Sequence, residues 1–130
     1  MARSPLQIGL VVLGVVQLAQ GAWMVLDPGS FFDAVGPFGT RNDHYVRDMA
    51  TPTLALGVTA LLAAPRPSWR LPVLTFSALF LGLHGVNHLA DIGEADPEAV
   101  GVTDFVTLAL GAAALAWLAV LARRDEGAVR

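Results

Sequence analysis

The sequence predicts an all-α protein: a four-helix transmembrane bundle whose helices run alternately up and down. Of its 130 residues, 55% are hydrophobic and only 15% are charged, whereas soluble domains carry roughly 25% charged residues. Four apolar stretches are each close to the ~20 residues that a helix needs to cross ~30 Å of hydrocarbon. They run from Pro5 to Leu26, His44 to Ala64, Leu71 to Ile92 and Val102 to Ala122. We therefore expect residues 1–130 to form a single transmembrane domain.

The first stretch follows Arg3, as the apolar core of a secretory signal follows a basic residue. Its apolar character continues to Leu26 and no A-x-A cleavage site appears, so we expect a retained helix. Residues 27–43 then form an outer loop rich in Gly, Pro and Phe. Ser30 followed by Asp33 fits a short capped helix there. The loop is expected to be a lid over a pocket or an interfacial anchor.

The other helices are bounded by turn signals, Pro65-Arg66-Pro67 before the third and Glu94 to Pro97 before the fourth. Small residues within the helices are expected to let backbones approach closely in lipid, namely Gly57, Ala78, Gly82 and Gly111.

Arginine placement predicts the orientation. Most arginines lie in the N-terminus, the second loop and the C-terminus, namely Arg3, Arg66, Arg70, Arg123, Arg124 and Arg130. Only Arg41 and Arg47 fall on the other side. The positive-inside rule then puts both termini in the cytoplasm and the protein in the plasma (inner) membrane.

Two short strings occur twice in the same order. Leu-Gly at 13–14 and 81–82 precedes Thr-Leu-Ala-Leu-Gly at 53–57 and 107–111. This pattern indicates an internal repeat of two helix hairpins, related by an axis along the membrane normal, with any site at their interface.

Polar residues in the four helices all fall in the outer half of the membrane. By helical spacing they form sets on single faces, and the sets are His44, Arg47, Asp48 and Thr51; His84, Asn87, His88 and Asp91; Gln17 and Gln20; and Asp104. A charged side chain at the bilayer centre costs roughly 2.5–3.5 kcal/mol on insertion scales, so these side chains should turn inward. They predict a polar pocket that opens to the outside.

Three kinds of chemistry fit such a pocket. His84 and His88, at i and i+4, suit a divalent metal such as Zn, completed by His44 or Asp104. A bis-histidine haem ranks below a metal ion, because few basic groups are at hand for its propionates. A metal-free acid–base site would use Asp91 or Asp104 as the acid, with Asp48 kept ionised by Arg47.

The predicted ligand is a small apolar molecule, quinone- or isoprenoid-like, held by His44, Gln17, Gln20, Asn87 and Thr51. The alternative is a non-catalytic accessory or scaffold subunit of a membrane complex, whose polar cluster packs the helices. A net charge of -3 argues against nucleic-acid binding. The sequence leaves open the ligand, any metal or haem, and whether the protein forms a homo-oligomer.

The chain resembles the small four-helix membrane proteins of the DoxX-like group. The resemblance rests on overall length, on the Arg-bearing entry to the second helix (Asn42 to Asp48), and on the Leu-Ala-Leu-Gly that follows. It implies a role associated with membrane redox chemistry, and it assigns no functional residue.

Overall fold

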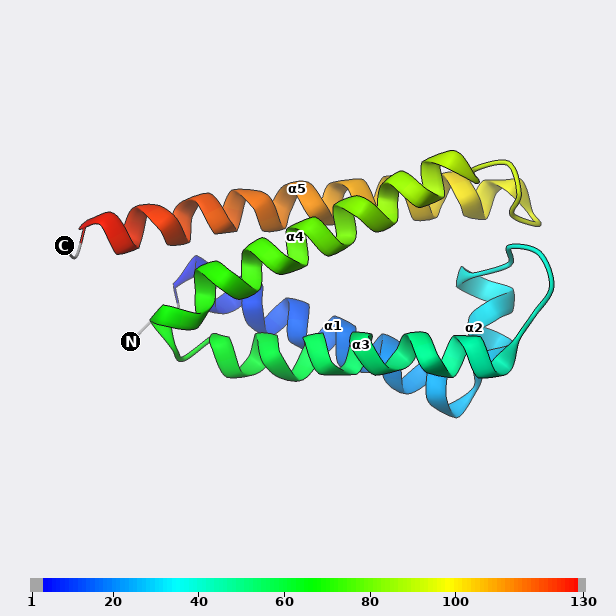
Figure 1. Cartoon of the computed structure of the whole chain (residues 1–130), viewed down its shortest axis with the longest axis horizontal. Helices are drawn as coiled ribbons and strands as arrows, with labels where there is room; N and C mark the ends of the chain where they lie inside the picture. Colours follow the sequence, from blue (N-terminus) through cyan, green and yellow to red (C-terminus); the bar gives the residue numbers. More distant parts are fainter. Residues whose placement is uncertain (1–3, 129–130) are drawn as a thin grey trace.

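The computed structural model describes residues 4–128, and that part of the chain is helical without a β-strand. Its helices are α1 (Pro5–Leu26), α2 (Pro28–Val35), α3 (Asp43–Ala63), α4 (Pro67–Ala90) and α5 (Glu98–Ala128) (Figure 1). The all-α prediction is confirmed. The short α2 lies in the predicted outer loop, where Asp27 rather than Ser30 is its N-cap.

Two helices begin earlier than the hydropathy pattern predicts. α4 begins at Pro67 instead of Leu71, because proline is well placed in the first turn, where its missing N–H has no helical partner. α5 begins at Glu98 instead of Val102, and an acidic residue in the first turn complements the helix dipole. α5 also continues past Ala122 to Ala128, through a charged segment that is polar but helix-compatible.

The long helices form two antiparallel pairs. α1 packs along α3, and α4 packs along α5, with far fewer contacts between the pairs (Figure 1). All four long helices share a core only where α1 begins, α5 ends and α3 turns into α4; its best-buried members include Leu10, Ala60 and Leu74. At the opposite end a second core of Met24, Phe31, Val46 and Ala50 joins only α1, α2 and α3. The two pairs are therefore held together mainly at one end.

Close packing within each pair involves the glycines noted in the sequence. A Cβ on Gly57 would lie 3.0 Å from the backbone nitrogen of Leu18 and 3.1 Å from the carbonyl oxygen of Gly14. In the second pair, a Cβ on Gly82 would lie 3.9 Å from the Cβ of Ala112. The repeated Leu-Gly strings thus face the partner helix in both pairs, and α1 and α3 approach more closely than α4 and α5.

Three helices of the described chain are long and apolar enough to cross a membrane: Pro5–Leu26, Pro67–Ala90 and Glu98–Asp125. This finding supports an integral membrane protein. The prediction of four spans is therefore confirmed for three helices and not for α3. α3 is nearly as long, but its first turns carry Asp43, Arg47 and Asp48, which lower its apolar character.

Candidate functional site

An aromatic stripe runs along one face of α4. Phe76, Phe80, His84 and His88 are spaced four residues apart, so their rings follow one another toward the C-terminal end of α4. Successive ring centroids are 6.1, 6.2 and 4.7 Å apart. The two histidines are joined directly, with 3.0 Å between their Nε2 atoms. The predicted pairing of His84 with His88 is therefore present.

Asp104 of α5 lies beside this pair. Its Oδ2 is 4.0 Å from Nδ1 of His88, and the two side chains are only 17% and 13% exposed. Both atoms are buried, and neither has a hydrogen-bond partner within the described chain. α5 packs against α4 at Gly85, where a Cβ would make an ordinary contact of 3.5 Å with the Cβ of Leu108. Three of the predicted site residues thus form one unit, which we call the His–Asp cluster (His84, His88 and Asp104).

The outer loop covers this cluster from one side. The Phe38 ring meets the His88 ring edge-on, with centroids 4.9 Å apart. The loop is attached to the α4–α5 connection, because the Asp96 N–H donates to the Pro37 carbonyl at 3.1 Å and Phe38 forms an isolated bridge with Ala95. Phe38 therefore covers one side of His88.

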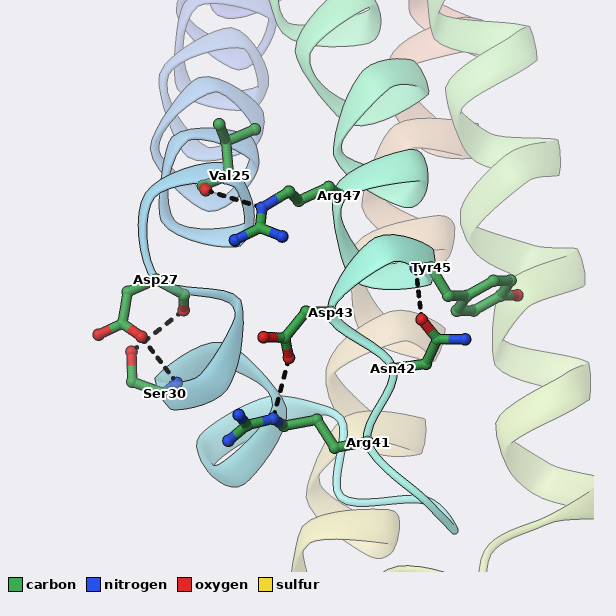
Figure 2. Close-up of polar contacts among 8 residues, drawn as sticks. All are labelled: Val25, Asp27, Ser30, Arg41, Asn42, Asp43, Tyr45 and Arg47. Carbon is green, nitrogen blue, oxygen red and sulfur yellow. Dashed lines mark hydrogen bonds and ion pairs between the residues drawn. The ribbon is translucent and has the colours of Figure 1, made fainter.

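The polar residues of α3 do not join the cluster. His44 pairs with Asp48 at 3.4 Å on a strongly exposed surface, with side chains 86% and 62% exposed. Arg47 reaches across to α1, where its Nε donates to the Val25 carbonyl at 3.5 Å (Figure 2). Thr51 is exposed, and its hydroxyl donates to the Asp48 carbonyl at 2.7 Å. At this end α3 packs on α1 and α2 rather than on α4, so the expected convergence from all four long helices does not occur.

The remaining predicted residues are spread over the molecule. Gln17 is buried in α1 and Gln20 is half-buried, whereas Asn87 on α4 and Asp91, its C-cap residue, are exposed. Within the described residues, no group of three His, Asp or Glu side chains is placed to hold a metal ion. The expected ligand set of His84, His88 and His44 is therefore not assembled.

An apolar crevice lies between α3 and α4, below the His–Asp cluster. Its volume is about 340 Å³, and it is open on one side. Its lining comes from α3 and from the part of α4 that includes Phe76 and Phe80, namely Pro52, Ala55, Leu56, Thr59, Pro72, Val73, Phe76 and Phe80. Phe80 connects the two features, because it lines the crevice and its ring is 6.2 Å from that of His84. Sequence reasoning missed Phe76 and Phe80, although their spacing from His84 was available as a signal.

A separate group of polar residues lies around α2, between the end of α1 and the start of α3. The Asp27 carboxylate accepts from the Ser30 N–H at 3.1 Å, and Arg41 pairs with Asp43 at 2.9 Å (Figure 2). The hydrogen bonds from Ser30, with a smaller contribution from the positive charge of Arg41, lower the pKa of Asp27 below its usual 3.8. Asp27 therefore caps α2, and Arg41 pairs with the first residue of α3.

A family described as "Domain of unknown function (DUF4345)" matches residues 5–92. The chain belongs to this family. The matched region covers α1 to α4, so Asp104 and the rest of α5 lie outside it. The DoxX-like resemblance is not confirmed, and neither a curated protein nor a solved structure matches the chain.

Proposed function

We propose that this integral membrane protein binds a small apolar ligand, quinone- or isoprenoid-like, between α3 and α4. The apolar chain of the ligand occupies the crevice, and its polar head reaches the His–Asp cluster. The observation that supports this proposal is the position of Phe80, which lines the crevice and contacts the edge of the cluster through His84. Pockets that combine an apolar lining with a few convergent polar groups are the usual form of small-molecule sites.

The proposal includes four membrane spans, with α3 as the fourth. α3 lies antiparallel to α1 along its length (Figure 1), and its charged residues gather at the outer end, where they reach the interface. Arg66, Arg70, Arg123 and Arg124 lie at the opposite end. By the positive-inside rule, this arrangement supports the proposal that this end and both termini are cytoplasmic. Arg3 and Arg130 lie outside the described residues. The site then opens toward the outer side of the plasma membrane.

The chemistry proposed for the site is acid–base exchange with the ligand head. Asp104 supplies a carboxylate and His84 and His88 supply imidazoles, which are the groups that most often move protons in proteins. Asp91, the C-cap residue of α4, follows His88 by three residues and would lie at the mouth of the proposed site.

Ligand binding can be tested by filling the crevice. Ala55 lines it from α3, and Ala55→Phe places an aromatic ring in the space that the ligand chain would occupy. We expect the detergent-purified protein to bind tritiated farnesol saturably, and the Ala55→Phe variant to lose this binding. Ala116→Phe, at an exposed position on α5, is the matched control and should bind as the unmodified chain does.

Two results would contradict the proposal. The unmodified chain would show no saturable farnesol binding, or Ala55→Phe would bind as tightly as Ala116→Phe. Either result would remove the crevice from consideration as a ligand site.

A second candidate function is that of a non-catalytic accessory subunit, in which the cluster only packs α4 on α5. It is favoured by the direct His84–His88 contact and by the position of Asp104 across the helix interface. Replacing His84 with Gln and His88 with Asn separates the two functions. A large loss of thermal stability in detergent supports the structural role, whereas loss of farnesol binding with little loss of stability supports the site.

A further inference from the structure

We infer that the ligand head is a hydrogen-bond donor, an alcohol or phenol rather than a carbonyl. Nδ1 of His84 accepts the hydrogen bond that this head donates. This inference rests on the proposed function, because it assigns the chemical class of the ligand bound there. It follows from the order in which Asp104, His88 and His84 meet.

Asp104 determines which nitrogen of His88 carries the proton. An ionised carboxylate can only accept hydrogen bonds, and a neutral imidazole has one N–H and one lone pair. The Asp104 Oδ2 lies 4.0 Å from Nδ1 of His88, and neither buried atom has another partner in the described chain. The negative charge beside Nδ1 favours the tautomer with the proton on that nitrogen. Nε2 of His88 then carries the lone pair and accepts a hydrogen bond.

His84 takes the complementary form. Its Nε2 lies 3.0 Å from Nε2 of His88, a distance that requires one N–H and one lone pair between them. Because His88 offers the lone pair, His84 donates from Nε2. The single N–H of a neutral His84 is therefore donated to His88, and Nδ1 of His84 remains a hydrogen-bond acceptor.

The acceptor at His84 Nδ1 is open to a ligand. The structure assigns this nitrogen no hydrogen-bond partner among residues 4–128, and His84 is exposed, whereas Phe38 covers only His88. The crevice is lined by Phe80, whose ring centroid lies 6.2 Å from that of His84, so a ligand head that extends beyond Phe80 would come to His84. A hydroxyl placed there donates to Nδ1, while a carbonyl oxygen faces a second lone pair.

The head group should dominate selectivity. Lipid tails are as apolar as the crevice walls, so leaving the bilayer gives the ligand chain no hydrophobic gain. A ligand head that cannot donate a hydrogen bond leaves Nδ1 of His84 unpaired in apolar surroundings. Its affinity should therefore be about tenfold lower than that of a head that donates.

The test compares two probes with the same chain, farnesol with its hydroxyl and farnesal with its aldehyde. Each unlabelled probe is used to displace tritiated farnesol from the purified full chain. The chain contains no lysine side chain that would form an imine with the aldehyde. We expect farnesol to compete about tenfold better than farnesal.

Asp104 acts here as a positioning residue, so its variants should change the ratio of the two affinities. In Asp104→Asn the side-chain amide can donate as well as accept, so both tautomers are supported and the ratio should fall toward one. Asp104→Glu keeps an acceptor and should restore the preference for farnesol. Asp33→Asn removes the same charge from an exposed site on α2 and should leave the ratio unchanged.

The outcomes separate this inference from the proposed function. Equal affinities, tighter binding of farnesal, or an Asp104→Asn variant that keeps the full preference would overturn the assignment of a donor head while the crevice site stands. Absence of saturable binding for both probes would overturn the proposed function and the inference together.

Discussion

The contact of α1 with α3 makes Gly57→Ala the most informative stability variant. The added Cβ would lie 2.8 Å from Cγ of Leu18, 3.0 Å from its backbone nitrogen, and 3.1 Å from the carbonyl oxygen of Gly14. The last two are backbone atoms of α1, which cannot rotate away as a side chain can. The two helices must therefore move apart for the methyl group to fit.

The expected magnitude follows from two opposing effects. Overpacking of a well-packed interface costs typically ~1–3 kcal/mol, while replacing glycine by alanine in a helix gains about 1 kcal/mol. Gly57→Ala should therefore lower the free energy of unfolding by about 1 kcal/mol. Gly82→Ala is the matched control, because its Cβ meets only the Ala112 Cβ at an ordinary 3.9 Å. Gly82→Ala should keep the gain of about 1 kcal/mol from replacing glycine in a helix. The free energies of unfolding of the two variants should therefore differ by about 2 kcal/mol.

The assay is reversible unfolding of each purified variant in mixed micelles of increasing sodium dodecyl sulfate content, followed by far-ultraviolet circular dichroism. The reasoning is refuted if both variants change the free energy of unfolding in the same direction by similar amounts. That result would mean that α1 and α3 do not meet at Gly57.

Two further predictions concern the ends of the molecule. The folded-state pKa of Asp27 is lowered, so the stability that its cap adds to α2 is fully present above the unfolded value of 3.8 and is lost as pH falls through the lower folded value. A carboxyl chemical-shift titration should therefore give a pKa below 3.8 for Asp27. An ordinary pKa would show that the hydrogen bonds from Ser30 are absent. Because the chain contains no cysteine, single substitutions report membrane sidedness cleanly: Thr40→Cys should react with a membrane-impermeant maleimide in intact cells and Ser68→Cys only after permeabilisation, and the reverse pattern would invert the proposed orientation.

The sequence by itself determined the local features. The positions of the long helices followed from the apolar stretches and their turn signals, because membrane dimensions and proline act through neighbouring residues alone. The lengths of α4 and α5 did not, since both helices extend beyond the apolar stretches. The meeting of His84 with His88 was predictable for the same reason, since residues four apart share a helix face whatever surrounds them. The stripe of Phe76 and Phe80 obeys the same spacing rule. It was not predicted as part of a site, because phenylalanine is equally suited to the buried and the lipid-facing sides of an apolar helix.

Only the tertiary structure decided which of these faces meet. In a membrane helix both the buried face and the lipid-facing face are apolar, so the sequence pattern does not determine how each helix is rotated. Close glycine contacts hold α3 against α1, and this arrangement turns His44 and Asp48 away from α4. The approach of α5 at Gly85 brings Asp104 to His88 instead. The candidate site therefore depends on helix rotation and backbone approach, which are properties of the packed helices and not of any single one.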